Sequence, residues 1–163
     1  MIIRNAEERD VPAITAIYNE AVVGSTATFD LDPVSVADRL VWFRKYGGRY
    51  PIIAVETENT GEVMGWGSLS PYSEKPGYRF TAEHSIYVSA KYHNQGVGKA
   101  VLQELLSLAK HHEFHSLIAR ISSENTASLK LHTSFGFAQA GVLQQAGYKF
   151  NRWIDIVLMQ KLL

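Results

Sequence analysis

Two titratable side chains and one glycine-rich turn are the features of this sequence best suited to chemistry. Glu83 begins an apolar segment, and a carboxyl group desolvated among apolar neighbours can have a raised pKa and act as a base. His132 lies in a later helical segment, where an imidazole can exchange a proton near neutral pH. Each residue also has an ordinary interpretation, as a solvated carboxylate or a packed histidine. The chemistry that both suggest is proton transfer.

The glycine-rich turn is predicted to join a strand to a helix. Residues 84–88 are β-branched and aromatic, and Gly96 and Gly98 follow after a polar turn. Apolar residues at positions 97, 101, 105 and 108, widened by those at 102, 106 and 109, indicate an amphipathic helix. Because the first N–H groups of a helix have no partner inside it, this turn can hold a phosphate.

Two common phosphate-binding motifs do not fit the turn. A P-loop needs glycine at position 93 and Ser or Thr at position 100, where this chain has His93 and Ala100. A dinucleotide-binding fingerprint needs a third glycine at the position of Val101, and it follows the first strand of its unit rather than lying past mid-chain. Taken alone, the turn is also compatible with a simple helix entry.

The rest of the chain supplies the elements that must position these residues. Strands are predicted at residues 2–4, 51–55, 63–70, 78–88, 116–121, 137–147 and 153–162. Helices are predicted from an Asp10 cap to about Val23, from an Asp32 cap to Gly47, from Val97 onward, and at residues 126–135. The order β-α-α-β-β-β-α-β-α-β-β predicts one α/β (α+β) domain over residues 1–163, with a mixed sheet and helices on both faces.

Composition excludes several classes of function. The 163 residues include 16 basic and 16 acidic side chains with no block of like charge, so nothing indicates binding to nucleic acid or to a membrane surface. No cysteine is present, which removes disulfides and thiolate sites. No apolar signal-peptide region or membrane-length run occurs. We therefore expect a cytoplasmic protein with no nucleic-acid or membrane partner.

A histidine cluster at residues 111–115 offers an alternative metal site. His111 and His115 are four residues apart, but the cluster lacks the His-Glu-x-x-His spacing that places two ligands and a base on one helical face. Histidines where a helix ends also complement the negative end of its dipole. We expect no metal.

The glycine turn resembles motif A of the GCN5-related N-acetyltransferases (GNAT), Gln/Arg-x-x-Gly-x-Gly/Ala, which holds the pyrophosphate of acetyl-coenzyme A (acetyl-CoA) on backbone amides. Gly96 and Gly98 match, and His93 stands at the Gln/Arg position. In the family, backbone amides of a bulged strand, here around Val88, polarise the acetyl oxygen. The resemblance implies that acetyl-CoA is bound by Ile86, Tyr87, Val88, Asn94, Gln95, Gly96, Val97, Gly98, Lys99, Asn125 and Ser128.

A second GNAT signature, Asn-x-x-Ala-x-x-x-Tyr-x-x-x-Gly-Phe, is matched with His in place of Tyr. Its positions are held by Asn125, Ser128, His132, Gly136 and Phe137. That replacement, together with residues 80–83 (Phe-Thr-Ala-Glu) and 147–153 (Gly-Tyr-Lys-Phe-Asn-Arg-Trp), resembles the phosphinothricin and methionine sulfoximine N-acetyltransferase branch over nearly the whole chain.

The resemblance implies an enzyme that acetylates a small-molecule amine. It implies Glu83 as the base, His132 as proton donor to the departing thiolate or as an alternative base, and a homodimer. The implied acceptor has an α-amino group beside a carboxylate and a sulfone, sulfoximine or phosphinate end. Another amine as acceptor, such as a polyamine or a protein N-terminus, and a coenzyme A-binding module without catalysis stay open as alternatives.

Arg79 is a candidate for binding the acceptor carboxylate. It lies four residues before Glu83, and on an extended strand that spacing places both side chains on one face. A guanidinium there could bind a carboxylate bidentately, although a solvated strand arginine is an equal reading. Further candidates for the substrate wall are Phe29, Tyr72 and Lys75.

Overall fold

The chain folds around one seven-stranded mixed sheet, as seen in a computed structural model that describes all residues 1–163. The strand order is β1-β2-β3-β4-β5-β7-β6, and only the β4–β5 pair is parallel. The strands are β1 (Ile2–Asn5), β2 (Ile52–Glu56), β3 (Val63–Pro71), β4 (Thr81–Val88), β5 (Ser116–Ser122), β6 (Ala138–Lys149) and β7 (Arg152–Leu162). The predicted element order and mixed sheet are confirmed.

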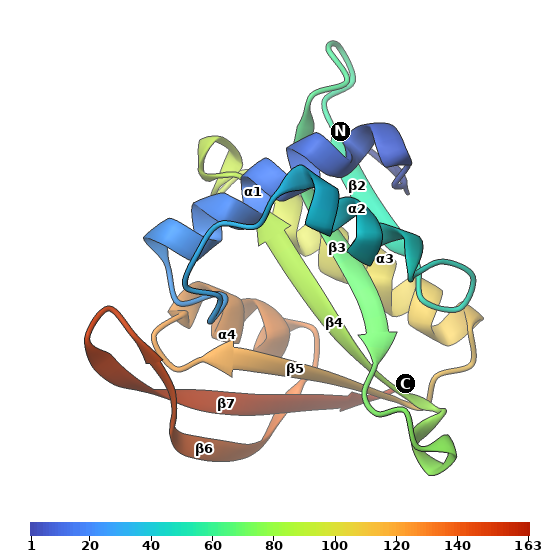
Figure 1. Cartoon of the computed structure of the whole chain (residues 1–163). Helices are drawn as coiled ribbons and strands as arrows, with labels where there is room; N and C mark the ends of the chain where they lie inside the picture. The colour runs from blue at the N-terminus through green and yellow to red at the C-terminus, as the bar shows by residue number, and fades with distance from the viewer.

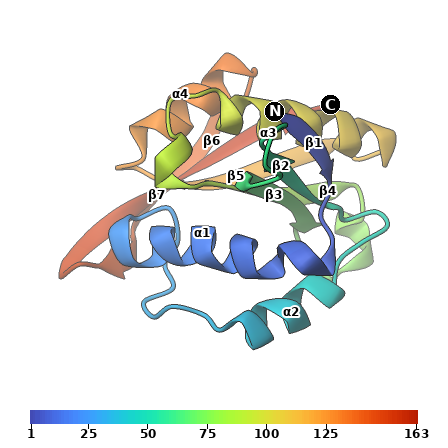
Figure 2. The same ribbon diagram turned by 90° about the horizontal axis from the view of Figure 1, so that it is seen from above.

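Four α-helices cover the two faces of the sheet, as predicted. They are α1 (Val11–Gly24), α2 (Val36–Arg44), α3 (Val97–His111) and α4 (Thr126–Ser134). Figures 1 and 2 show α1 and α2 on one face, with α3 and α4 on the other. None of these helices combines the length and the apolar composition that crossing a bilayer requires.

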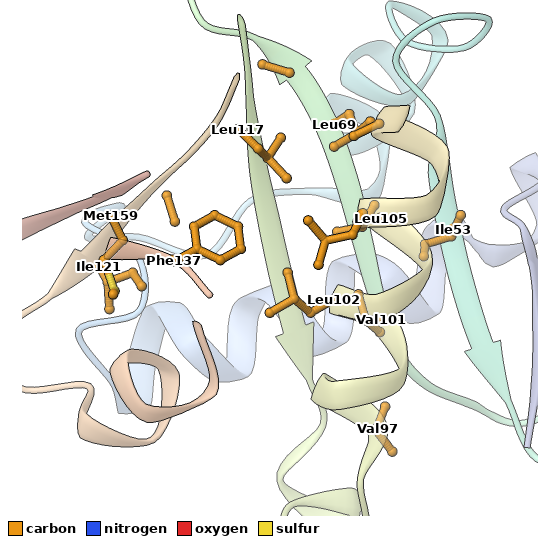
Figure 3. Packing of buried hydrophobic residues seen from close by; sticks show 14 of the residues in the cluster. Ile53, Leu69, Val97, Val101, Leu102, Leu105, Leu117, Ile121, Phe137 and Met159 are labelled. Carbon is orange, nitrogen blue, oxygen red and sulfur yellow. The ribbon is translucent and has the colours of Figure 1, made fainter. Parts of the chain in front are cut away.

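The larger core lies between α3 and the sheet (Figure 3). Val97, Val101, Leu102 and Leu105 of α3 are fully buried there, which confirms the predicted apolar stripe. Burying each such side chain stabilises the fold by about 1.5–3 kcal/mol. A smaller core on the opposite face packs α1 against Trp66 of β3. The two cores fix α3 and α1 on either side of the central strands.

The parallel strands β4 and β5 separate after a short paired stretch. Their pairing runs only from Thr81/Ser116 to Glu83/Ile118, although β4 continues to Val88 and β5 to Ser122. Figure 1 shows the two arrows diverging toward their carboxyl ends. The edge of β4 beyond Glu83 therefore has backbone groups that no neighbouring strand uses. The functional site described below occupies this opening.

Three local expectations were wrong in whole or in part. Strand β4 begins at Thr81 rather than residue 78, because Pro76–Tyr78 forms a 3-10 helix and Arg79 follows in a helical conformation (φ −58°, ψ −18°). Asp10 holds the N-cap position of α1 as predicted, but its side chain makes no cap hydrogen bond, since its carboxylate pairs with Arg4 at 2.7 Å. Helix α2 is capped by Ser35 rather than Asp32, and the Ser35 hydroxyl accepts from the Asp38 N–H at 3.0 Å.

The loop between α1 and α2 is held against the C-terminal strands. Lys149 of β6 is buried, and its ammonium donates to the Thr28 carbonyl at 2.8 Å. The Thr26 and Ser122 hydroxyls are 2.8 Å apart, which ties the loop to the end of β5. A Cβ atom at Gly147 would overlap the Phe29 ring, so glycine is needed there for the ring to pack on β6. These contacts make the loop a fixed wall beside the opening between β4 and β5.

Candidate active site

The N-terminus of α3 is built to receive an anion. Gly96 adopts the left-handed conformation (φ 82°) that lets the chain turn into the helix. Helices α2 and α4 have side-chain caps from Ser35 and Asn125, but α3 has none. The first N–H groups of α3 are therefore free for an external acceptor at the positive end of the helix dipole.

A cleft of about 1070 Å³ runs from this helix terminus to the opening between β4 and β5. Of the residues predicted to bind the coenzyme, those lining it are Ile86, Tyr87, Val88, Asn94, Gly96, Val97, Gly98, Lys99, Asn125 and Ser128. Gln95 does not line the cleft, because its amide donates to the Lys91 carbonyl at 3.1 Å. The structure thus brings together ten of the predicted residues, which come from two separate segments of the sequence, 86–99 and 125–128.

His93, which departs from motif A, contacts the backbone of β4. Its Nε2 lies 3.0 Å from the carbonyl oxygen of Val88, and a carbonyl only accepts, so Nε2 donates the proton. The side chain thus links the turn before α3 to the end of β4.

The strand bulge that the family resemblance implied around Val88 is absent from the pairing of β4 with β3. That pairing keeps one register from Gly65/Val88 to Pro71/Ala82.

A buried imidazole pair lies on the α4 side of β4. Nε2 of His132 is 2.8 Å from Nε2 of His84, and Nδ1 of His132 is 2.7 Å from the Ser128 carbonyl. That carbonyl requires the His132 proton on Nδ1, so Nε2 of His132 accepts and Nε2 of His84 donates when both rings are neutral. Nδ1 of His84 is buried without a hydrogen-bond partner.

Burial favours the neutral form of both rings. It lowers the pKa of His84, and the neighbouring His132 charge lowers it further. Burial also lowers the pKa of His132, while the Ser128 carbonyl opposes that shift. Both nitrogens of His132 therefore already have partners in the free protein, and the ring is positioned as part of a fixed pair.

Glu83 projects from the opposite face of β4. Side chains alternate along a strand, so Glu83 shares the α1 side with Tyr87, whose ring packs on Tyr18 of α1 at 5.0 Å. Arg120 of β5 reaches the same face, and its Nε donates to Glu83 Oε1 at 2.9 Å. The expected environment of apolar neighbours was wrong, because the carboxylate faces a guanidinium. The two candidate proton-transfer residues thus lie on different sides of the sheet.

Arg79 does not share the Glu83 face, because it lies outside β4. Its guanidinium stacks over the Phe80 ring at 4.5 Å and is exposed. Tyr72 packs edge-on against Tyr78 at 5.1 Å in the same β3–β4 connection, and Lys75 precedes the 3-10 helix there. None of these three residues lines the large cleft or the smaller pocket beside it.

Two residues of the site, His84 and Arg120, were missed by sequence reasoning. Both line a small pocket between β4 and β5 together with His132 and Ser122. Arg120 could have been identified from the sequence pattern. It stands between Ala119 and Ile121, which are both buried, so its side chain must face the other side of the strand. His84 had none, because its partner lies 48 positions away.

The histidine cluster after α3 does not gather into a metal site. His111 and His112 pack ring against ring at 5.1 Å at the end of the helix. Nowhere in residues 1–163 do three or more His, Cys, Asp or Glu side chains lie close enough together to hold a metal ion.

Comparison with known proteins identifies the class to which this fold and cleft belong. Residues 11–137 match the acetyltransferase (GNAT) family. The chain is 40% identical over 159 residues to an L-methionine sulfoximine/L-methionine sulfone acetyltransferase of Pseudomonas aeruginosa, covering 97% of this chain and 92% of that protein. It is 39% identical over 161 residues to a phosphinothricin N-acetyltransferase of Alcaligenes faecalis, covering 98% and 81%.

A solved acetyltransferase structure from Salmonella typhimurium with acetyl-CoA superposes with a TM-score of 0.95 at 36% identity, covering all of this chain and 94% of that one. The chain therefore belongs to the GNAT family. It is an acetyl-CoA-dependent N-acetyltransferase. The uncapped α3 terminus, the unpaired edge of β4 and the volume of the cleft all fit that coenzyme.

Proposed function

We propose that this enzyme acetylates the α-amino group of a small amino-acid-like acceptor of the methionine sulfone, methionine sulfoximine or phosphinothricin type. The observation that carries the proposal is the Glu83 carboxylate on the α1 face, beside the point where β4 and β5 separate. An amine approaching from that face meets a base, while the coenzyme cleft begins at the N-terminus of α3 and is lined by residues of α1, α3 and α4. The names of the relatives support this acceptor class.

Acetyl-CoA supplies the acetyl group as a thioester. In our proposal the amides at the start of α3 hold its pyrophosphate, and the free edge of β4 from Ile86 to Val88 orients the acetyl oxygen. Glu83 accepts one proton of the acceptor ammonium through Oε2, the carboxylate oxygen that Arg120 does not contact. The free amine then attacks the thioester carbonyl, the C–S bond breaks, and the second proton lost from the nitrogen passes to the departing thiolate, which leaves as coenzyme A. The His84–His132 pair keeps the α4 wall of the site in place.

A thiol-release assay over four classes of acceptor tests the proposal. Amino-acid analogues, polyamines, aminoglycosides and short peptides would be compared at equal acetyl-CoA concentration. We expect methionine sulfone, methionine sulfoximine or phosphinothricin to give the highest kcat/KM. A polyamine or a peptide as the best acceptor would refute the acceptor assignment and leave the acetyltransferase class intact. Coenzyme binding without turnover of any amine would instead favour the non-catalytic module.

We also propose that the enzyme is a homodimer formed through the β6 edge of the sheet. Strand β6 has 12 residues and no partner on its outer side, and such an edge can pair with another chain. Large apolar side chains around it are exposed, namely Val142, Leu143, Tyr148, Phe150 and Trp153. A second copy brings the same surface and would cover it by symmetry.

The oligomeric state in solution tests the dimer. Light scattering after size-exclusion chromatography should give twice the 18.2 kDa chain mass. A Trp153→Ser variant should shift the mass toward the monomer, because Trp153 is the most exposed aromatic side chain of this surface, at 62%. Wild-type protein that runs as a monomer at all concentrations would exclude the proposal.

A further inference from the structure

The Arg120–Glu83 pair has a free hydrogen-bonding edge on each partner. Arg120 contacts Glu83 through Nε and Nη2, and both nitrogens converge on the single oxygen Oε1. Glu83 Oε2 and Arg120 Nη1 have no partner in the protein. A guanidinium offers five donors in a rigid fork, so the end of this fork remains available for a second carboxylate.

The pair is also open to solvent, although it is built on two rigid strands. The Arg120 side chain is 58% exposed and the Glu83 side chain 20% exposed. Their strands are held in register at Glu83/Ile118, two residues before Arg120. Arg120 lines the small pocket between β4 and β5, next to Ser85 and Ser122. A positive and a negative group are therefore displayed side by side at the start of the opening.

We propose that Arg120 binds the carboxylate of the acceptor and sets the preference for zwitterionic α-amino acids; this rests on the function proposed above. An α-amino acid carries its ammonium and carboxylate on one carbon, which makes it complementary to an adjacent Glu–Arg pair. The ammonium approaches Oε2 of Glu83, and the carboxylate takes the free end of the Arg120 fork. Arg120 is then a binding residue for the acceptor and a positioning residue for Glu83.

Arg120 takes the role that the sequence spacing predicted for Arg79, which is to bind the acceptor carboxylate. Arg79 stacks on Phe80 outside β4 and has no carboxylate beside it. It lines neither the large cleft nor the small pocket, so it cannot present a base and an anchor together. The two arginines therefore predict different kinetic behaviour when the acceptor loses its carboxylate.

Steady-state kinetics with three matched acceptors test the proposal: L-methionine sulfone, its α-carboxamide, and the amine that lacks the carboxyl group. In the full-length enzyme, Arg120→Gln should raise KM for the amino acid by about 10- to 100-fold, because charge-assisted bonds are lost. KM for the two analogues that lack a carboxylate should change by less than about twofold, while kcat should fall for all three because Glu83 loses its support. Arg120→Lys should restore part of the KM preference.

Two further variants make the outcome decisive. Arg44→Gln removes an exposed arginine at the end of α2 that pairs with Glu8. This variant should leave kcat and KM unchanged for all three acceptors. Loss of the carboxylate preference in Arg79→Gln but not in Arg120→Gln would overturn the inference, as would equal effects of Arg120→Gln on KM for all three acceptors. Wild-type enzyme that accepts no amino acid at all would refute the proposed function itself, so the two failures are distinguishable.

Discussion

Nε2 of His132 lies 2.8 Å from Nε2 of His84, and both rings are buried between β4 and α4. The rings are stacked at a centroid distance of 5.0 Å, and each also contacts the Phe137 ring. The family signature places Tyr where this chain has His132, so the pair replaces a phenol with two imidazoles. The proton-donor role expected for His132 requires one of its nitrogens to leave its present partner.

The imidazole pair should make stability depend on pH. The pKa of each histidine in the folded protein lies below its ordinary value of 6.5, so the unfolded chain binds protons first as the pH falls. The stabilisation is complete above pH 6.5 and is lost progressively below it, at about 1.4 kcal/mol per pH unit for each histidine. Urea unfolding at pH 7.5 and 5.5 measures this loss.

A His84→Gln variant isolates the contribution of one ring, since the glutamine amide can still donate to His132 Nε2. The loss of unfolding free energy between the two pH values should be smaller than in wild type by about 1.4 kcal/mol. His111→Gln, at an exposed position where α3 ends, serves as the control and should keep the wild-type loss. An unchanged pH dependence in His84→Gln would show that the pair does not titrate as described.

Replacing the proposed base should slow turnover without weakening coenzyme binding. Glu83→Gln keeps the shape of the side chain but cannot accept a proton, so kcat should fall by roughly 10²–10⁴-fold. Affinity for acetyl-CoA should stay close to wild type, because Glu83 lines no part of the coenzyme cleft. Initial rates and calorimetry check the two expectations. If Glu83→Gln turns over normally while His132→Ala does not, the two residues exchange roles.

The glycine turn should tolerate one methyl group in the free protein but not a branched side chain in the coenzyme complex. A Cβ atom at Gly98 would lie 3.6 Å from Leu131 Cδ2 and 3.8 Å from Val88 Cγ2, which is ordinary contact. Gly98→Ala should therefore fold with nearly wild-type thermal stability. Acetyl-CoA at about 100 times its Kd should stabilise wild type by about 2.7 kcal/mol, and this gain should vanish in Gly98→Val. Calorimetric affinity equal to wild type in Gly98→Val would remove the phosphate-binding role of the turn.

The loop that carries Phe29 should depend on Gly147. Because an added Cβ overlaps the Phe29 ring, Gly147→Ala should lower the free energy of unfolding by about 1–3 kcal/mol, the range typical of overpacking. KM for the acceptor should rise as well, since the displaced loop forms the wall of the site. The double variant Gly147→Ala/Phe29→Leu should recover part of the stability. Equal stabilities of the single variant and wild type would show that the ring moves away freely.

The sequence by itself determined the parts of this protein that depend on local pattern. The apolar spacing of residues 97–109 fixed α3 and its buried face, and the glycines at 96 and 98 fixed the turn before it. Most residues predicted to bind the coenzyme follow from that turn, since they lie on it or on the strand beside it. The same periodicities gave the element order and hence the mixed sheet.

Only the tertiary structure decided which side chains meet. Arg120 reaches Glu83 across 37 positions through the pairing of β4 with β5, and His132 of α4 reaches His84 across 48 positions. No local pattern encodes either contact. Conversely, the sequence spacing predicted Arg79 on the same strand face as Glu83, and the structure places Arg79 outside that strand. Its spacing was right for a strand, but Pro76 starts a 3-10 helix and keeps Arg79 out of β4. Alternation along β4 places Glu83 and His84 on opposite faces, but only the contacts from β5 and α4 give these adjacent residues their different surroundings.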